Sequence, residues 1–337
     1  MPRPIDELLY VTANQMVQRE MLESKIQEFN QFRSVYEQQK SVKDEGYKIV
    51  LGNKNKQCRF CGRGAPNVTF KKKAHVIPQL LGNRNIVSLF ECDSCNEDIF
   101  SDYESSLAAF VGVIRIFEEI KGQKGVPKYK DKKTSLRIEW KDGMFTFSEK
   151  VNETTSQIKS DDENRQVTIR TIRDSYYPIR VYKSLVKIAY CLLDEGELNN
   201  FKFIHRLLMS DELDERRLPF IRLFWYFLTN GVSFKKPWAK LFTRRPNLDN
   251  PFFPEKTLVI SFANLTYQIF LLSDRDLDLV KSSQSFTCIR FPVPTDQYQV
   301  FNDDLSSPDK KVGEGTNHTF SFERIKTTNH ISENHEL

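Results

Sequence analysis

Two pairs of cysteines with CxxC spacing constrain the fold of this chain more than any other sequence feature. Cys58 and Cys61 form the first pair, and Cys92 and Cys95 form the second, with thirty residues between the pairs. Structural Zn²⁺ sites prefer four tetrahedral ligands of this kind, and each CxxC turn can present two thiolates to one ion. We therefore predict a structural Zn²⁺ held by all four cysteines. A closed four-thiolate site has no open coordination position, so this ion is expected to hold structure and to perform no chemistry.

The N-terminus and the hydropathy of the chain indicate the compartment. The first residues, MPRPIDELLY, lack the apolar stretch of a signal peptide. No run approaches the ~18 consecutive apolar residues of a membrane helix. We therefore expect a cytoplasmic protein that does not enter a membrane. In a reducing cytosol, paired cysteines are metal ligands more often than disulfides. The two single cysteines, Cys191 and Cys288, lie in apolar patterns and are expected to be core thiols.

Basic residues concentrate around the cysteine pairs. From Lys54 to Arg84 the chain has eight Lys or Arg residues and no Asp or Glu, and a second basic run spans residues 121–133. Local fields of this kind attract polyanions, because neutralising phosphates releases condensed counterions. A solvated surface is the alternative reading of either run by itself. Beside a metal module, the basic runs favour a nucleic-acid partner.

A distinctive stretch lies between the cysteine pairs and directly after them. It reads FKKKAHVIPQLLGN over residues 70–83 and CDSCN over residues 92–96. The stretch combines a strand ending in His, an apolar pair followed by Pro, a Gly-Asn loop, and a CxxC-Asn that opens a helix. In these elements it resembles the HNH endonuclease family, in its zinc-bearing branch with a ββα-metal core. The resemblance covers roughly residues 56–105, which is under a fifth of the chain.

The resemblance implies an active site that hydrolyses phosphodiester bonds, with DNA as the substrate. His75 would be the general base that activates water. Asn96, at the helix start, would hold a catalytic divalent ion, Mg²⁺ or Mn²⁺, which stabilises the transition state. Asn83, or in second place Asn85, would brace the loop that orients His75.

Basic side chains near His75 are candidates for contacts with the nucleic acid. Alternate residues of a strand share a face, so two lysines before His75 would point to the same side as its imidazole. Such contacts fix a phosphate backbone in position without reading bases. The candidate nucleic-acid contacts are Lys71, Lys73 and Arg84.

One position departs from the family pattern. The family commonly has Asp or Glu as a metal ligand directly before the strand His, where this chain has Ala74. An Asn carbonyl alone would hold Mg²⁺ poorly, because that ion prefers anionic oxygen. Either a carboxylate comes from elsewhere, or the site is degenerate, or His75 itself binds a softer ion such as Mn²⁺, Ni²⁺ or Zn²⁺. The candidate carboxylates are Asp98, Asp102 and Glu104 on the predicted helix and Glu91 and Asp93 near the second cysteine pair, with Asp98 and Glu104 carried forward as metal ligands beside Asn96.

The apolar periodicity predicts an α+β fold. Over residues 5–42, apolar residues recur every three or four positions, which predicts a long amphipathic helix within an N-terminal segment, 1–50. That helix would pack on the body of the protein or pair with a second copy. The zinc module, of ββα-metal or treble-clef type, is expected over 51–120, with its helix continuing through Phe117.

The remaining sequence predicts a mixed α+β domain over residues 121–300, without an assigned role, and a polar tail over 301–337. Helical periods occur at 178–192 and 198–208. Strand patterns, two of them hairpins, occur at 136–147, 167–171, 220–228, 257–272 and 286–293. A partner protein or a second copy could bind through this domain or through the N-terminal helix.

Three functions fit these features. The first is a metal-dependent endonuclease that cleaves DNA. The second is a catalytically degenerate zinc-knuckle module that binds nucleic acid or protein, with Ala74 marking the lost activity. The third is a regulated effector, such as a bacterial defence or toxin-like nuclease, whose C-terminal region senses a signal or binds a partner.

Overall fold

The computed structural model describes residues 16–52, 55–131, 133–150, 156–210, 220–248, 250, 252–281 and 286–321. The chain divides into two compact units. Unit 1 comprises Met1–Pro127 and Asp174–Val312, and unit 2 comprises Lys128–Arg173 and Gly313–Leu337. The fold is mixed α+β and its sheets are mostly antiparallel, as the sequence predicts for the class.

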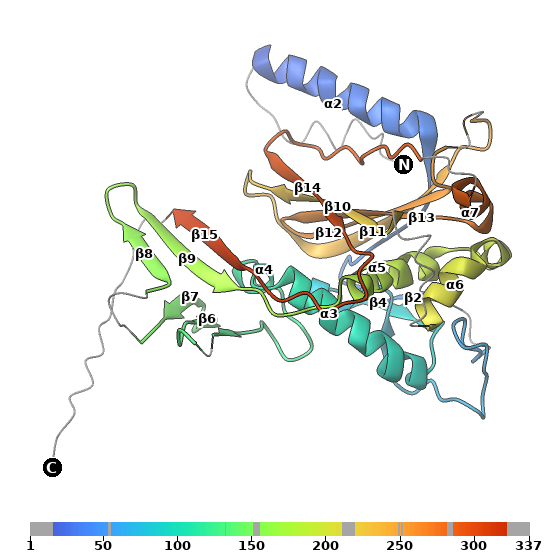
Figure 1. Ribbon diagram of the computed structural model, residues 1–337, viewed down its shortest axis with the longest axis horizontal. Coiled ribbons are helices and arrows are strands. Elements are labelled where there is room, and N and C mark those ends of the chain that lie inside the picture. The colour runs from blue at the N-terminus through green and yellow to red at the C-terminus, as the bar shows by residue number, and fades with distance from the viewer. Residues whose placement is uncertain are drawn as a thin grey trace. The chain divides into compact units, whose positions relative to one another are not determined.

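A six-stranded antiparallel sheet forms the centre of unit 1 (Figure 1). Its strand order is β1-β11-β12-β13-β10-β14. The strands are β1 (Tyr36–Lys43), β10 (Arg222–Leu228), β11 (Phe234–Arg244), β12 (Lys256–Ala263), β13 (Leu265–Leu271) and β14 (Tyr298–Asp304). Every residue of β12 and β13 is buried, because both faces of the sheet are covered.

Helices cover the two faces of this sheet. On one face, Phe32 of helix α2 (Met16–Val35) packs with Val259 of β12. On the other face, Leu185 of helix α5 (Pro178–Leu192) belongs to the same apolar cluster as the neighbouring strand residue, Leu258. Adjacent strand residues point to opposite faces, so β12 contributes side chains to the apolar clusters on both faces of the sheet. Figure 1 shows α2 and α5 on opposite sides of the sheet.

The cysteine-rich module lies on the α5 side and shares its apolar core. A small sheet of order β2-β4-β3 contains the candidate catalytic strand. The module consists of β2 (Ile49–Leu51), β3 (Ala74–His75), the 3₁₀ turn η1 (Gln79–Leu81), β4 (Ile86–Ser88), the π-helical turn η2 (Cys95–Phe100), α3 (Ser101–Val111) and α4 (Ile114–Phe117). Gly112, with φ 60°, separates α3 from α4, so the helix expected to run through Phe117 is interrupted there.

The other regular elements in the described part of unit 1 are helices. Helix α5 begins at Pro178, whose fixed φ suits a first helical turn. A capping box formed by Asp194 and Glu197 opens the next turn. The remaining elements are η3 (Glu195–Phe201), α6 (Lys202–Met209) and α7 (Asp274–Lys281).

Unit 2 contains two three-stranded sheets. Their strand orders are β5-β6-β7 and β15-β9-β8. The strands are β5 (Tyr129–Lys130), β6 (Arg137–Lys141), β7 (Met144–Ser148), β8 (Ile158–Asp161), β9 (Gln166–Ile172) and β15 (Gly315–Ser321). The β6–β7 hairpin turns at Asp142-Gly143, as its sequence predicts.

Three expectations about elements were wrong. The helix predicted to reach residue 42 ends at Val35, because residues 36–43 pair with β11 as strand β1, and residues 5–15 lie outside the described part. Residues 286–293 form no strand; they are coil, in which Phe291 donates its backbone N–H to Gln268. The expected polar tail contributes the end of β14 and all of β15, and residues 322–337 lie outside the described part.

Candidate active site and metal centre

The four cysteines converge on one point. All their sulfur atoms lie within 4.8 Å of one another, and the Cys58–Cys95 and Cys61–Cys92 Sγ distances are both 3.8 Å. A tetrahedron of ligands about 2.3 Å from a zinc ion has edges of about 3.8 Å. The cluster therefore fits one Zn²⁺ as the sequence predicts. The backbone N–H of Cys92 points at Cys58 Sγ, and Arg63 Nε donates to Cys61 Sγ, so both favour thiolates.

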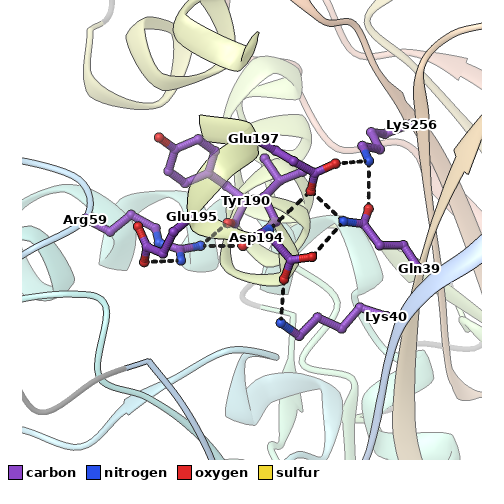
Figure 2. Close-up of polar contacts among 9 residues, drawn as sticks. Gln39, Lys40, Arg59, Tyr190, Asp194, Glu195, Glu197 and Lys256 are labelled. Atoms are coloured by element: carbon purple, nitrogen blue, oxygen red, sulfur yellow. Dashed lines mark hydrogen bonds and ion pairs between the residues drawn. The ribbon is translucent and has the colours of Figure 1, made fainter. Parts of the chain in front are cut away.

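Arg59 ties the first CxxC turn to helix α5. Its guanidinium donates to the carbonyl oxygens of Tyr190 (2.9 Å) and Leu193 (3.0 Å) and pairs with Glu195 (2.6 Å) (Figure 2). It also lies 3.6 Å from the ring centroid of Phe90. Orphan carbonyls at a helix C-terminus need donors, and a buried arginine supplies them. The place of Arg59 in the basic run, beside the first cysteine pair, gives no sign of this link to α5.

A second polar network at the end of α5 reaches the six-stranded sheet. Glu197 accepts hydrogen bonds from Gln39 of β1 and from buried Lys256 of β12, while Asp194 pairs with Lys40 (Figure 2). The zinc module, α5 and the large sheet are therefore joined by side chains from four distant segments.

His75 ends strand β3 and is almost buried, with 7% of its surface exposed. Burial, together with the nearby charges of Lys73 and Lys187, lowers the pKa of His75 to about 4. The imidazole is therefore neutral at pH 7 and keeps a lone pair that can accept a proton. The predicted base is thus in the required protonation state.

Asn83 lies directly beside His75 and is fully buried. Its Nδ2 donates to the carbonyl oxygens of Ile77 (2.6 Å) and Ile86 (2.9 Å) and lies 3.3 Å from His75 Nδ1. Its Oδ1 accepts from the backbone N–H groups of Asn85 (3.0 Å) and Ile86 (2.8 Å). The Asn83 amide has two protons, and the two shorter contacts, to the Ile77 and Ile86 carbonyls, use both of them. Asn83 therefore holds the loop beside His75 but does not fix the imidazole tautomer.

Asn85, the second candidate for bracing the loop, contacts the carboxylate of Asp44. The Asp44 carboxylate accepts hydrogen bonds from Asn85 Nδ2 (2.7 Å) and from the backbone N–H groups of Arg84 (2.7 Å), Asn85 (3.2 Å) and Gly46 (3.0 Å). Burial by itself would raise the pKa of Asp44, but these hydrogen bonds lower it below its ordinary value. Sequence reasoning missed this residue, because an Asp-x-Gly turn gives no sign of its distant partner.

Lys187 of helix α5 contacts strand β3 at His75. Its side chain is 1% exposed, and its Nζ donates to the backbone carbonyl of His75 at 3.2 Å. The same Nζ lies 2.9 Å from a carboxylate oxygen of Glu91 and 3.8 Å from one of Glu104. Burial by itself would lower the pKa of Lys187, but the two carboxylates raise it above its ordinary value. Sequence reasoning also missed Lys187, which appears as one polar position in a helical pattern.

The carboxylates named as metal ligands do not converge with His75. Within the described ranges, the four cysteines form the one group of three or more His, Cys, Asp or Glu residues whose ligand atoms all lie within 4.8 Å of one another. Glu91 and Glu104 face Lys187, and Asp93 accepts hydrogen bonds from Thr69, Lys71 and Lys72.

The remaining candidate ligands sit on η2 and α3. Asn96 is half-buried at the start of η2, and Asp98 is exposed. Asp98 and Asp102 line a shallow hollow in which Arg180 pairs with Asp102 at 3.0 Å. With Ala74 before His75, this donor set does not fit a hard divalent ion as it stands.

The candidate nucleic-acid contacts have mixed surroundings. Lys71 is exposed, whereas Lys73 Nζ donates to the Arg84 carbonyl at 3.0 Å. Arg84 Nη2 donates to the carbonyls of Lys121 (2.8 Å) and Gly122 (2.7 Å). Arg84 therefore joins the two basic runs of the sequence, although its guanidinium is partly used within the protein.

Comparisons with known proteins agree with this geometry over one segment. Residues 58–108 match the model of a family described as HNH endonuclease. No curated protein and no solved structure matches the chain. No helix in the described ranges combines the length and the apolar character that crossing a bilayer requires. The matched segment contains all four cysteines, His75, Asn83 and Asn96, and over residues 58–108 the chain is therefore similar to the HNH endonuclease family.

Proposed function

We propose that this protein is an endonuclease that hydrolyses phosphodiester bonds of DNA, with His75 as the general base. The observation that carries the proposal is the neutral, nearly buried His75 beside the bracing Asn83, within a segment that matches the HNH endonuclease family. The family match supports nuclease activity. The assignment of DNA and of individual residue roles is our own step.

In the proposed reaction, neutral His75 takes a proton from a water molecule as that water attacks phosphorus. The bond from phosphorus to the leaving oxygen then breaks, and this oxygen takes up a proton from solvent to become a hydroxyl group. Asn83 keeps the loop and the imidazole in a fixed relation, and Lys71 and Lys73 attract the phosphate backbone. A bound phosphate would also raise the pKa of His75 from about 4, which would strengthen it as a base.

The metal requirement follows from the family and is a separate proposal. Mg²⁺ or Mn²⁺ at Asn96, with Glu104 or Asp98, would supply charge stabilisation at the phosphate. Glu91 and Glu104 face Lys187, and Ala74 offers no ligand. The proposed reaction therefore contains no step at this ion. A dependence on added Mn²⁺ or Ni²⁺ without activity in Mg²⁺ would favour direct binding by His75.

Cleavage of supercoiled plasmid tests the proposed function. Purified protein is incubated with Mg²⁺, Mn²⁺, Ni²⁺ or no added metal, beside the variants His75→Ala and His318→Ala. His318 is a matched control, because it is a part-buried histidine of unit 2 that contacts Thr171. We expect cleavage by the unaltered protein and by His318→Ala, and loss of at least about 100-fold in His75→Ala. Cleavage that survives His75→Ala would remove His75 as the base.

The second candidate is a zinc-knuckle module that binds nucleic acid without cutting it. The observation that favours it is Ala74 together with the engaged carboxylates at the site. Retained binding of a DNA duplex in a gel-shift assay, without cleavage in any metal, would establish this candidate. A role as a bacterial defence or toxin-like effector is tested by growth, since induction of the unaltered protein should then slow growth and induction of His75→Ala should not.

A further inference from the structure

Lys187 is an unusual residue for the middle of a buried helix. All residues of α5 except Arg180 are buried, and Lys187 is among the largest side chains that are fully buried. An ammonium group loses its hydration there and must be compensated by charge and hydrogen bonds. Glu91 compensates it with a side chain that is also completely buried.

The contacts of Lys187 surround the candidate catalytic strand. Its Nζ donates to the His75 carbonyl (3.2 Å) and pairs with Glu91 (2.9 Å), which directly precedes the second CxxC turn. It also lies 3.8 Å from Glu104 of α3 and 4.9 Å from the ring centroid of Phe100 of η2. One side chain thus connects the strand, the second cysteine pair and the helix that together form the matched segment.

The His75 backbone is held on both sides of its side chain. Strand β3 pairs with β4 in the register His75–Val87. The backbone N–H of the next residue, Val76, donates to the Ile86 carbonyl. Asn83 contacts the imidazole. The His75 carbonyl accepts a hydrogen bond from Lys187 of α5, which lies outside residues 58–108.

We propose that Lys187 is a positioning residue for His75, holding the His75 backbone so that the imidazole points into the reaction site; this inference rests on the proposed function. A general base that shifts by about 1 Å can cost two orders of magnitude in rate. Lys187 itself touches neither substrate nor the reacting atoms.

The main test variant removes both charges of the buried pair, and the reference variant keeps Lys187 with Glu104 3.8 Å away. The full-length double variant Lys187→Met with Glu91→Gln removes both charges, and Glu91→Gln alone isolates the contribution of Lys187. The matched control is Lys183→Met, because Lys183 is buried one turn earlier on α5 but donates to the Ser210 carbonyl at 2.7 Å.

Two readouts distinguish positioning from a purely structural role. In plasmid cleavage by zinc-loaded protein, we expect the double variant to lose roughly 10- to 100-fold in kcat relative to Glu91→Gln, with KM unchanged within about twofold. Lys183→Met should keep the kcat of the unaltered protein. In spectra of protein with ¹⁵N-labelled histidine, the imidazole signals of His75, assigned with His75→Ala, should move in the double variant and stay in Lys183→Met.

An unchanged kcat in the double variant would overturn the proposal, as would an equal loss in Lys183→Met. If the unaltered protein does not cleave any nucleic acid, the proposed function fails. The histidine spectra still decide the positioning role in that case, because unmoved His75 signals would contradict it without any activity measurement.

Discussion

At the scale of the residue, the surroundings of His75 determine its charge. Burial, with Lys73 and Lys187 nearby, lowers its pKa to about 4. The unfolded chain binds the same proton near its ordinary pKa of about 6.5, so between these pH values the unfolded state binds more protons. The stability that neutral His75 contributes is therefore fully present above about pH 6.5 and is lost as the pH falls toward 4.

This linkage predicts a difference in acid sensitivity between the unaltered protein and His75→Gln. Between pH 7 and pH 5, the unaltered protein should lose about 1 to 2 kcal/mol more of its free energy of unfolding than the variant does. Urea unfolding at the two pH values measures both losses, and all other titrating groups are shared. Equal losses would show that the pKa of His75 is not lowered in the folded protein.

Asp44 shows how a residue remote in sequence can hold the loop that carries Asn83. Its carboxylate receives hydrogen bonds from Arg84, Asn85 and Gly46. Asp44→Ala leaves part-buried donors without this acceptor and should lower the free energy of unfolding by about 1 to 3 kcal/mol. Because the loop carries Asn83, kcat should fall by roughly tenfold or more as well.

The control for Asp44 is its neighbour. Glu45 is exposed and its carboxylate contacts the hydroxyl of Tyr47, so Glu45→Ala should change stability by less than about 0.5 kcal/mol. Urea unfolding and plasmid cleavage are measured on both variants. Wild-type stability and kcat in Asp44→Ala would mean that the loop is held without this carboxylate.

At the scale of the element, the cysteine cluster links segments that have little regular structure of their own. The loop around Cys58 and the start of η2 meet at the four sulfur atoms, and Arg59 continues the link to α5. A metal that closes such a loop contributes its binding free energy to folding. We therefore expect η2, with Asn96, and α3, with Glu104, to depend on the ion for their position.

Metal analysis tests this dependence. Inductively coupled plasma measurement should find about one zinc per chain, and Cys95→Ser should lose the zinc together with at least about 3 kcal/mol of stability. Cys288→Ser, outside the cluster, is the control and should retain zinc. A zinc-free native protein, or a Cys95→Ser variant with unchanged melting temperature, would contradict a structural zinc site at the four cysteines.

At the scale of the whole molecule, the HNH segment shares one apolar core with the rest of unit 1. The cluster contains Ile77 and Phe100 of the segment, Leu185 of α5, and Leu258 of the central sheet. Cutting the segment free would expose these side chains, at about 25 cal/mol for each Å² of apolar surface. The division of the chain into a separate module at 51–120 stays a prediction from sequence.

Expression of residues 51–120 alone tests that division. From the shared core we expect the fragment to bind zinc but to lack a cooperative thermal transition, and to cleave plasmid at least about tenfold more slowly than the full chain. Calorimetry and the cleavage assay measure these outcomes. A fragment that melts cooperatively and retains full activity would show that the module is independent and would also count against positioning by Lys187.

Much of the local structure is readable in the sequence because backbone geometry sets the spacings. The two CxxC turns, the β6–β7 and β12–β13 hairpins and helix α5 all follow their patterns. Strand β1 did not, because its residues continue a helical spacing and become a strand only by pairing with β11. Pairing between distant strands leaves no mark in a short window of sequence.

The sequence by itself predicted the four-cysteine cluster, the strand that ends in His75 and the place of Asn83 beside it, since these residues lie close together along the chain. Only the tertiary structure decided what surrounds them. Lys187 lies 112 residues from His75, and Arg59 lies 131 residues from Tyr190. In a sequence, a lone Lys, Arg or Asp looks like a solvated surface residue. Folding buries it, and the cost of desolvating its charge then requires the specific partners that make it part of the site.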